Sequence, residues 1–402
     1  MVSKDVSNNL NIQWVNSVKN IHEEDWNRIF GHSLIKSQKL FIVMEDSNFD
    51  DVEYHYLLIY KNDIIANIIP CFCYKLDLLH LVTSTSFKAL ISKCRKTFPN
   101  LLKLKTFVVG SYIATCEHFI EDQDKILGQE FMPNYIKSLN YHLKAKYQET
   151  NSQILFIKDI RQRYITYIRN ILDKEVLFLK SFPTTAIPIF DNYPKFLKKK
   201  NRKRYRIFKQ KFDSKYTWEV CYDFQKYIPL LSKLYLNVLN KAANKFEILN
   251  PSFFYNIKKI FQENSFFLLA RNHNNEIVLG EIVIEDEDKL LPLYLGIDYE
   301  KGDTKILYLN TIFRTIKEAE IRNKSFVDFG QTSYYPKVMS GAFIEHIYYG
   351  FWSNKPFFSW LINNVFKYIF IPPTIFRNTY LEKYKKQAIK KLEGKGFILV
   401  NT

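Results

Sequence analysis

The stretch "SFFLLARNHNNEIVLGEIVIEDEDKLLPLYLGID" (265–298) decides the fold class. It holds three apolar runs, at 265–272, 277–285 and 290–298, which are separated by the short polar turns HNNE and DEDK. This pattern predicts three consecutive strands that pair in an antiparallel manner. Because parallel strands need long crossover connections, the stretch excludes a doubly wound nucleotide-binding fold and favours a mixed sheet.

The segments on either side of this stretch complete an α+β order. The expected elements are a strand at 216–223, helices at 223–242 and 250–263, the three strands, a helix at 304–323, and strands at 325–330 and 343–351. Asn250 is a favourable N-cap for the second helix, and Pro251 suits its first position. We therefore expect residues 191–355 to form a domain around a mixed, mainly antiparallel sheet flanked by helices.

The first half is also predicted to combine helices and strands. The expected elements are a helix within 23–35, a hairpin of strands at 53–60 and 64–76, strands at 105–111 and 153–159, a helix at 129–147 between them, and a helix at 161–172. An extended, proline-containing connector is expected near 180–192. Residues 1–190 are the expected first domain, and 356–402 an aromatic-rich, basic C-terminal helical extension.

Composition is that of a folded protein with room for two cores. The 402 residues are 47% hydrophobic and 25% charged, with 11 glycines. The five cysteines show no CxxC pair and no Cys/His spacing suited to zinc, so reduced, mostly buried thiols are expected. None of the eight histidines forms a metal-binding spacing or a visible triad. The sequence thus predicts no metal site and no tightly bound cofactor.

The N-terminal residues and the segment 357–376 indicate where in the cell the protein is expected. The N-terminal residues "MVSKDVSNNLNIQW" are polar and do not resemble a secretion signal. The apolar segment 357–376 contains Asn363, Asn364 and Lys367 and ends near a proline pair, which does not suit a membrane span. We expect a cytoplasmic protein whose segment 357–376 packs on its domain. An interfacial helix at the inner face of the membrane is the alternative.

The positive charge is concentrated in the second half of the chain. The net charge is +17, and residues 1–190 hold 23 Lys and Arg against 20 Asp and Glu, so the remainder carries +14. Residues 195–211 alone contain ten Lys and Arg with no acid, and 377–395 add seven bases against two acids. A polyanionic partner is the expected consequence.

Four stretches resemble a known family. "YPKFLKKKNRKRYRIFKQKF" (193–212) is similar to the entry segment of FemABX-like proteins, a branch of the GNAT acyltransferase superfamily that includes peptidoglycan-biosynthesis proteins. "LYLGIDYEKGDTKILYLNTIFRTIKEAEIRNKSFVDFGQTSYYPKVMSGA" (293–342) resembles their core, and "IIANIIPCF" and "FVVGSY" resemble their degenerate N-terminal unit. The resemblance implies tandem GNAT-like domains and transfer of an acyl or aminoacyl group to an amine acceptor.

The chain departs from GNAT proteins that use acetyl-CoA. Those proteins bind the pyrophosphate with a Gln/Arg-x-x-Gly-x-Gly/Ala loop, whereas "YEKGDTKILYLN" here has a single glycine, Gly302. We therefore expect a donor that is not bound through that loop. The resemblance leaves aminoacyl-tRNA, acyl-carrier protein and acyl-CoA as candidate cosubstrates.

The expected catalytic residues are Lys337, Asp328 and Glu281. Lys337 follows Pro336, whose fixed φ suits a positioned cation for a developing oxyanion; a solvated surface lysine is the alternative. Asp328 would orient the lysine or bind the amine, or else form the polar face of a strand. Glu281 is a candidate proton acceptor, as is Glu285 four residues later, although exposed strand charges are the commoner explanation.

Further side chains are expected to bind ligands. Gln331, Tyr334 and Tyr335, with Tyr294 as a weaker candidate, would line a cleft, unless the rings serve only for packing. The donor-binding residues would be Lys198, Arg202, Arg206 and Lys209, which recur near helical spacing. This basic stripe suits tRNA phosphates, a phosphopantetheine carrier or anionic lipid headgroups; a solvated helix is the alternative. No DNA-binding motif accompanies it, so no DNA partner is expected.

The sequence thus predicts an N-acyltransferase with a degenerate first unit. The competing class is a non-catalytic GNAT-like protein that docks an acidic partner or a membrane surface.

Overall fold

The chain folds into two compact units. The computed structural model describes residues 3–4, 10–82, 84–113, 132–242, 247–372 and 379–400. Unit 1 comprises Met1–Ser181, Asn244–Glu247 and Ile347–Pro372; unit 2 comprises Phe182–Ala243, Ile248–His346 and Pro373–Thr402. The units are discontinuous in sequence, whereas the expected domains 1–190, 191–355 and 356–402 are contiguous segments.

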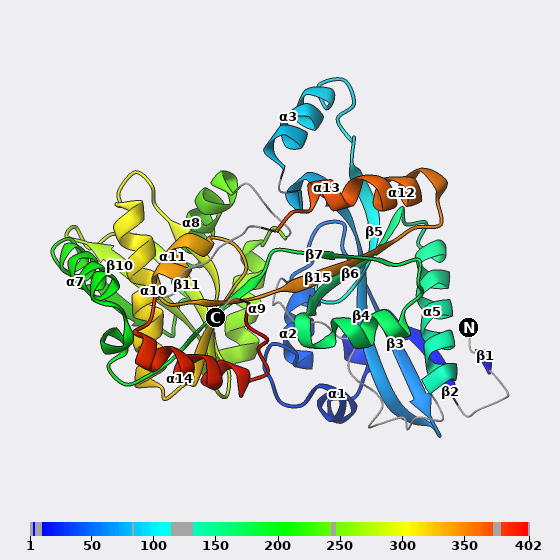
Figure 1. Ribbon diagram of the computed structural model, residues 1–402, viewed down its shortest axis with the longest axis horizontal. Coiled ribbons are helices and arrows are strands. Elements are labelled where there is room, and N and C mark those ends of the chain that lie inside the picture. The colour runs from blue at the N-terminus through cyan, green and yellow to red at the C-terminus, as the bar shows by residue number, and fades with distance from the viewer. Residues whose placement is uncertain are drawn as a thin grey trace. The chain divides into compact units, whose positions relative to one another are not determined.

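The sheet of unit 1 has eight strands, counted over the described residues, in the order β1-β2-β3-β4-β5-β6-β15-β7 (Figure 1). Their bounds are β1 Ser3–Lys4, β2 Leu10–Val15, β3 Glu53–Lys61, β4 Ile64–Asp77, β5 Lys103–Val109, β6 Ile154–Arg161, β7 Leu177–Lys180 and β15 Ile347–Trp352. Neighbouring strands are antiparallel except β5 and β6, which are parallel.

The sheet of unit 2 has seven strands within the part of the chain that the structure describes, in the order β14-β8-β13-β12-β11-β10-β9. Their bounds are β8 Thr184–Pro188, β9 Tyr216–Cys221, β10 Ser265–Asn272, β11 Ile277–Glu285, β12 Lys289–Ile297, β13 Phe326–Gly330 and β14 Phe343–Glu345. Here β12 and β13 form the parallel pair. The meander of β10, β11 and β12 is antiparallel, which confirms the prediction from residues 265–298.

The two sheets repeat one plan and exchange strands. In each, a parallel pair follows a run of antiparallel strands, and a strand from elsewhere in the chain is inserted next: β15 lies between β6 and β7, and β8 lies between β13 and β14. The predicted connector at 180–192 therefore begins at the last residue of β7 in one sheet and contains β8 of the other sheet. The single strand expected at 343–351 is likewise divided between the sheets. An apolar sequence pattern predicts that a strand is buried, but it does not predict which sheet the strand joins.

Helices flank both sheets. Those of unit 1 are α1 Glu23–Phe30, α2 Gln38–Asp46, α3 Thr85–Cys94, α5 Met132–Glu149, α6 Ile165–Ile171, α12 Pro356–Leu361 and α13 Lys367–Ile369, with a π-helical turn at Ile362–Phe366. Those of unit 2 are α7 Lys199–Asp213, α8 Ile228–Lys241, α9 Pro251–Phe261, α10 Thr304–Ile321, α11 Tyr334–Met339 and α14 Glu382–Glu393. Within the described residues, no helix combines the length and apolarity needed to cross a membrane.

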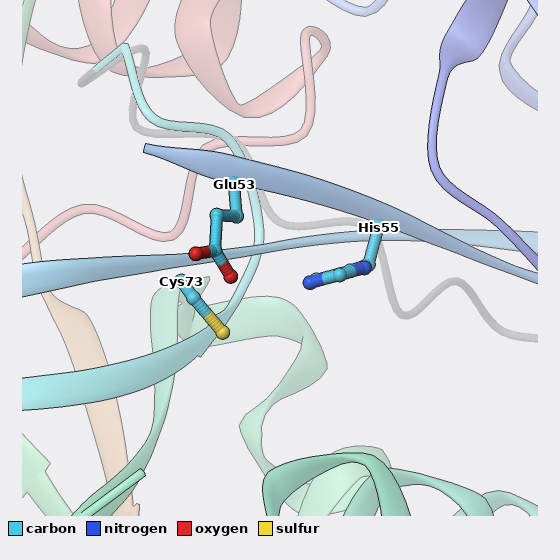
Figure 2. A group of neighbouring side chains, drawn as sticks. All are labelled: Glu53, His55 and Cys73. Carbon is cyan, nitrogen blue, oxygen red and sulfur yellow. The ribbon is translucent and has the colours of Figure 1, made fainter. Parts of the chain in front are cut away.

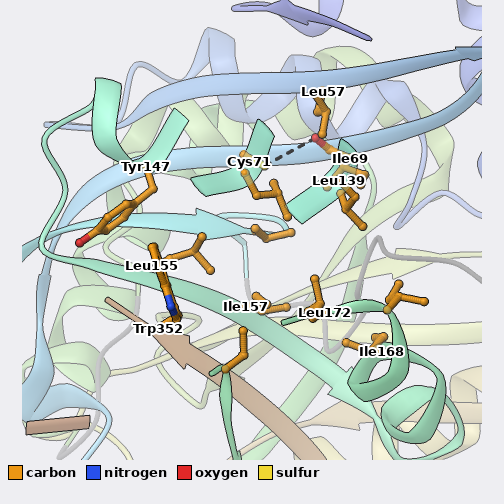
Figure 3. Packing of buried hydrophobic residues seen from close by; sticks show 14 of the residues in the cluster. Leu57, Ile69, Cys71, Leu139, Tyr147, Leu155, Ile157, Ile168, Leu172 and Trp352 are labelled. Atoms are coloured by element: carbon orange, nitrogen blue, oxygen red, sulfur yellow. Dashed lines mark hydrogen bonds between the residues drawn. The ribbon is translucent and has the colours of Figure 1, made fainter. Parts of the chain in front are cut away.

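The core of unit 1 lies between its sheet and α5 and α6. Figure 3 shows Leu57 and Ile69 from the central strands beside Leu139 of α5, and Ile168 of α6 belongs to the same buried cluster. The cysteines behave as expected where they are described: three are buried, one is partly exposed, and all four are free thiols. Cys116 lies outside the described residues.

Unit 2 has a packed helix layer on each face of its sheet. On one face α7 lies against α10, where the ring centroids of Tyr205 and Phe313 are 4.6 Å apart. On the other face α8 crosses β12 closely, because Gly296 has no side chain; a Cβ there would lie 2.6 Å from the backbone nitrogen of Tyr235. The Asn250 side chain accepts a hydrogen bond from the Phe253 amide, which confirms the predicted cap of α9.

Candidate active site in the second unit

Strands β12 and β13 diverge along the sheet of unit 2. They pair at only two positions, Lys289 with Phe326 and Leu290 with Val327, although both strands continue further. Burial of β12 drops after this point, and residues 292–295 are partly exposed. Where the parallel strands part, backbone groups lose their partners in the sheet, and a ligand can bind beside them.

Glu281 is a buried carboxyl group on β11, the strand next to β12. It is 7% exposed, and the Thr315 hydroxyl of α10 donates a hydrogen bond of 2.8 Å to it. Burial raises the pKa of Glu281 to about 7, although the Thr315 hydrogen bond and the positive charge of Lys337 act in the opposite direction. A carboxyl group with a pKa near 7 is suited to accept a proton at neutral pH. The alternative that Glu281 is merely an exposed charge on a strand is therefore wrong, because the side chain is buried.

Glu285 lies on the same face of β11 and has a different environment. Its carboxylate pairs with Arg322 at 2.6 Å and with Lys324 at 3.0 Å. The Glu285 carboxylate thus has two cationic partners, whereas Glu281 has a neutral hydroxyl as its hydrogen-bond donor. Of the two acceptors that the sequence left open, Glu281 has the environment suited to proton transfer.

Lys337 lies in α11, a helix of six residues where the sequence predicts a loop. Its side chain is 6% exposed, so it is not a solvated surface lysine. The Nζ atom donates to the carbonyl oxygens of Phe329 at 2.6 Å and Gln331 at 2.8 Å, at the end of β13. These hydrogen bonds hold the ammonium group in place, and its charge reaches Glu281.

Tyr308 joins these groups and was not identified from the sequence. Burial raises its pKa to about 12, with an opposing hydrogen bond from Ser333 and a contribution from the negative charge of Glu281. Tyr308 and Thr315 are seven residues apart on α10, which places them on one helix face. The seven-residue spacing of Tyr308 and Thr315 was the signal that the sequence offered. With 27 tyrosines in the chain, however, this spacing does not single out Tyr308 as a site residue.

Asp328 and its neighbours anchor the end of β13. Asp328 is buried; it accepts hydrogen bonds from the Thr184 hydroxyl at 3.4 Å and from the Gly330 amide at 3.0 Å. By strand alternation it faces away from the side of the sheet that carries Val327 and α10. The hydrogen bond from Thr184 ties β13 to the inserted strand β8, and the one from Gly330 lies within β13.

The four expected substrate-binding residues separate into two groups. Gln331 donates from its side-chain amide to the Phe182 carbonyl at 2.9 Å, and the Tyr334 hydroxyl donates to the Pro183 carbonyl at 3.0 Å. These two hold the segment before β8, while the ring of Tyr335 is exposed.

Tyr294 lies apart from the other expected site residues. By register it shares the sheet face of Ile282, opposite to the face of Glu281. Its ring lies 5.7 Å from that of Tyr235 and 6.0 Å from that of Phe253, centroid to centroid. Lys337 thus lies near enough for its charge to lower the pKa of Glu281, whereas Tyr294 lies on the other face of the sheet.

The start of α10 carries a carboxylate. The Asp303 side chain caps the helix by accepting a hydrogen bond of 3.0 Å from the Ile306 amide. In a helix that binds a pyrophosphate, such amides point at the phosphate oxygens. A capping carboxylate at this end occupies a donor and repels an anion.

The basic stripe lies on α7. Its apolar side packs inward, because Phe212 is buried and the Phe208 carbonyl accepts a hydrogen bond from Asn310 of α10. On the outer side, Lys198 lies 3.8 Å from Glu382 and Lys209 pairs with Asp213.

Two arginines of the stripe and one outside it complete this surface. Arg202 and Arg206 are exposed and make no ion pair with the residues that the structure describes. Arg204 lies over the ring of Tyr335, with 5.9 Å between its Cζ atom and the ring centroid. The exposed arginines Arg202 and Arg206 therefore lie on α7, the helix whose Arg204 contacts Tyr335 of α11. Helix α11 also carries Lys337.

The repeated sheet plan, with its parallel pair and inserted strand, defines a tandem GNAT-like fold of the FemABX type. The chain is similar to the crystal structure of FemX, with a TM-score of 0.53 over 87% of this chain and 100% of that chain, at 10% identity. This likeness confirms the predicted fold, and at that identity it shows the fold alone.

Other solved structures are similar at lower TM-scores. L-PGS from Bacillus licheniformis matches with a TM-score of 0.46, 82% of this chain, 96% of that chain and 11% identity. A tandem GNAT protein from the clavulanic acid biosynthesis pathway matches with a TM-score of 0.46, 84% of this chain, 98% of that chain and 7% identity. No family model matches the sequence, and no curated protein matches it.

Proposed function

We propose that unit 2 transfers an acyl or aminoacyl group to an amine. The observation that carries this proposal is the buried carboxyl group of Glu281, whose pKa is raised to about 7 within reach of the Lys337 charge. The fold supports the same class of reaction, since the chain shares the GNAT-like arrangement. The roles of Lys337, Asp328 and the other expected site residues are part of this proposal.

The proposed reaction is aminolysis of an activated carbonyl. The amine nitrogen attacks the carbonyl carbon of the donor, a new C–N bond forms, and the C–O or C–S bond to the carrier breaks. Glu281 accepts the proton that the amine loses, and Lys337 provides positive charge where the oxyanion develops. The proton then passes to the departing carrier oxygen or sulfur, which returns Glu281 to its starting state.

We propose a donor that is not held through an acetyl-CoA phosphate loop. The Asp303 cap at the start of α10 disfavours a pyrophosphate there. Exposed Arg202 and Arg206 on α7 instead favour an extended polyanion, as in aminoacyl-tRNA or acyl-carrier protein. Acyl-CoA held in another way is the third candidate.

Intact-mass analysis tests this function directly. Candidate amines are incubated with the full chain and aminoacyl-tRNA, acyl-carrier protein or acyl-CoA, and the mass gain of the amine identifies the donor. Glu281→Gln is expected to lower the rate by about 10²- to 10⁴-fold, the usual contribution of a general base. Glu285→Gln is the same-strand control and should retain activity if its thermal unfolding shows that it is folded.

Lys337→Ala tests the second group. Loss of transfer with unchanged polyanion binding supports the proposed role, whereas full activity in this variant would contradict it. Should every donor and amine leave the mass unchanged while polyanions bind, the competing class, a non-catalytic binding protein, becomes the better explanation.

A peripheral membrane contact is a second candidate, favoured by exposed aromatic rings in unit 1. Phe357, Trp360 and Tyr368 on α12 and α13 are exposed; Trp360 has 58% of its surface accessible. Aromatic residues on a short amphipathic segment are suited to a lipid interface. Sedimentation with anionic vesicles tests this, and Trp360→Ala should reduce the bound fraction while Tyr141→Ala, at an exposed ring elsewhere in the unit, should not.

A further inference from the structure

Three potential metal ligands meet on the sheet of unit 1, far in sequence from the site described above. They are Glu53 and His55 of β3 and Cys73 of β4. Glu53 is paired directly with Cys73 across the two antiparallel strands, and His55 lies two residues along β3 on the same face. Strand register alone therefore places a carboxylate, an imidazole and a thiol side by side.

The side chains are directed toward one another. The ligand atoms of the three residues all lie within 4.8 Å of one another. Figure 2 shows the His55 ring pointing toward the Glu53 carboxylate and the Cys73 sulfur. Glu53 is exposed while His55 and Cys73 are buried, so the group has an open side and an enclosed side.

The imidazole of His55 has one nitrogen engaged and one available. Its Nδ1 atom lies 3.1 Å from Oδ1 of Asn16, an oxygen that can only accept, so Nδ1 carries the proton. The Nε2 atom is then a lone-pair acceptor, and within the described residues this buried atom has no hydrogen-bond partner. His55 is only 9% exposed. A buried unpartnered acceptor is costly, and a bound cation would satisfy it.

The hydrogen bond from His55 Nδ1 to Asn16 is of the kind that orients a metal-binding histidine. A ligating histidine generally donates its other ring N–H to an oxygen, which sets both the tautomer and the ring orientation. The ring orientation set by Asn16 leaves Nε2, the nitrogen that faces Glu53 and Cys73, as the atom that would bind the metal.

We propose that Glu53, His55 and Cys73 bind a zinc ion. Thiolate, imidazole and carboxylate are the ligands that zinc accepts together, and three protein ligands leave a fourth tetrahedral position for water. Tetrahedral zinc needs ligand atoms about 3.5 Å apart, so small side-chain rotations suffice from the observed arrangement. On binding, the Cys73 thiol loses its proton to solvent and a sulfur–zinc bond forms.

The site would join the first residues of β3 to β4 and stabilise unit 1. It requires no residue of unit 2, so it is independent of the proposed transfer reaction. A chain that does not bind zinc would therefore leave the proposed transfer reaction unaffected, and a chain that shows no transfer would leave the zinc proposal unaffected.

Metal binding to the full chain tests the proposal. The protein is stripped with a chelator, and zinc affinity is measured by competition with a chromophoric chelator. One zinc ion per chain is expected. Replacement by cobalt should give thiolate-to-cobalt charge-transfer absorption together with the visible bands of a tetrahedral site.

Matched variants assign the ligands. Cys73→Ser should abolish the charge-transfer band, and His55→Gln and Glu53→Gln should each weaken affinity by at least about tenfold. Cys94→Ser replaces a thiol on α3 outside the group and should leave binding unchanged. Asn16→Leu should weaken affinity by about 10- to 100-fold while the charge-transfer band persists at saturating cobalt, because Asn16 positions His55.

Two results would overturn the proposal. The first is a chain that takes up no zinc while its circular dichroism spectrum is that of a folded protein. The second is binding that survives in Cys73→Ser and His55→Gln alike. If a ligand variant is too unstable to purify, raised thermal stability of the unmodified chain on addition of zinc decides instead, and no rise counts against the site.

Discussion

The buried carboxyl group of Glu281 predicts how folding stability depends on pH. Its ordinary pKa of 4.5 is raised to about 7 in the folded chain, mainly by burial. The folded state therefore binds this proton more tightly than the unfolded state does. The resulting contribution to stability is complete below about pH 4.5 and is lost as the pH rises through about 7. It amounts to about 3 kcal/mol, because each tenfold change in proton affinity is worth about 1.4 kcal/mol.

Glu281→Gln isolates this contribution, because glutamine has nearly the same shape and cannot ionise. The Thr315 hydroxyl can still donate to the glutamine oxygen. We expect the variant to have nearly the stability of the unmodified chain at pH 5 and to exceed it by up to about 3 kcal/mol at pH 8. The free energy of unfolding is measured by urea titration at each pH, with a check that the slope with urea is unchanged.

Glu285→Gln is the control on the same strand. It removes the partner of Arg322 and Lys324, so it should destabilise the chain by about 1–3 kcal/mol at pH 8. Opposite effects of two Glu-to-Gln changes would show that environment, and not residue type, decides the outcome. The reasoning is refuted if Glu281→Gln changes stability by the same amount at pH 5 and pH 8.

Three further perturbations follow from the structure. Thr315→Val removes the hydrogen bond that lowers the pKa of Glu281, so the pH–rate profile of transfer should move upward by about one unit. An unshifted profile would argue against Glu281 as the titrating base. If tRNA is the proposed polyanionic partner, Arg202→Glu combined with Arg206→Glu should weaken its binding and flatten the salt dependence, by about one unit of slope for each phosphate that the helix no longer neutralises. Equal slopes would remove α7 from the binding surface. Gly341→Ala should lower stability by more than about 2 kcal/mol, because φ is +106° and the new Cβ would overlap the Tyr193 hydroxyl; a thermal midpoint equal to that of the unmodified chain would contradict this.

Much of the fold could be predicted from the sequence because local patterns determine elements. The meander at 265–298 and the helix at 304–323 are predicted close to their observed bounds, since period-2 and period-3.6 patterns are local properties. The same order of elements leads to Glu281 and Lys337 as candidates. The loop expected around Lys337 is a short helix, because Pro336 occupies a helical position near the N-terminus of α11, where it is tolerated.

Long-range pairing determined what the sequence could not predict. Strand patterns at 177–188 and 343–352 do not say that β8 and β15 are exchanged between sheets, since an apolar strand suits any buried sheet position. The burial that raises the pKa of Glu281 exists only in the folded chain, where Thr315 of α10, 34 residues later, lies against the carboxyl group.

The same distinction holds for the proposed zinc site. The sequence shows Glu53, His55 and Cys73 without any metal-binding spacing, and from such a pattern no metal is expected. Only the register of β3 against β4 places a residue opposite a partner twenty positions away and on the same face. By itself the sequence determined the elements and their order. The tertiary structure decided which side chains share one environment, because register and burial arise only when distant strands pair.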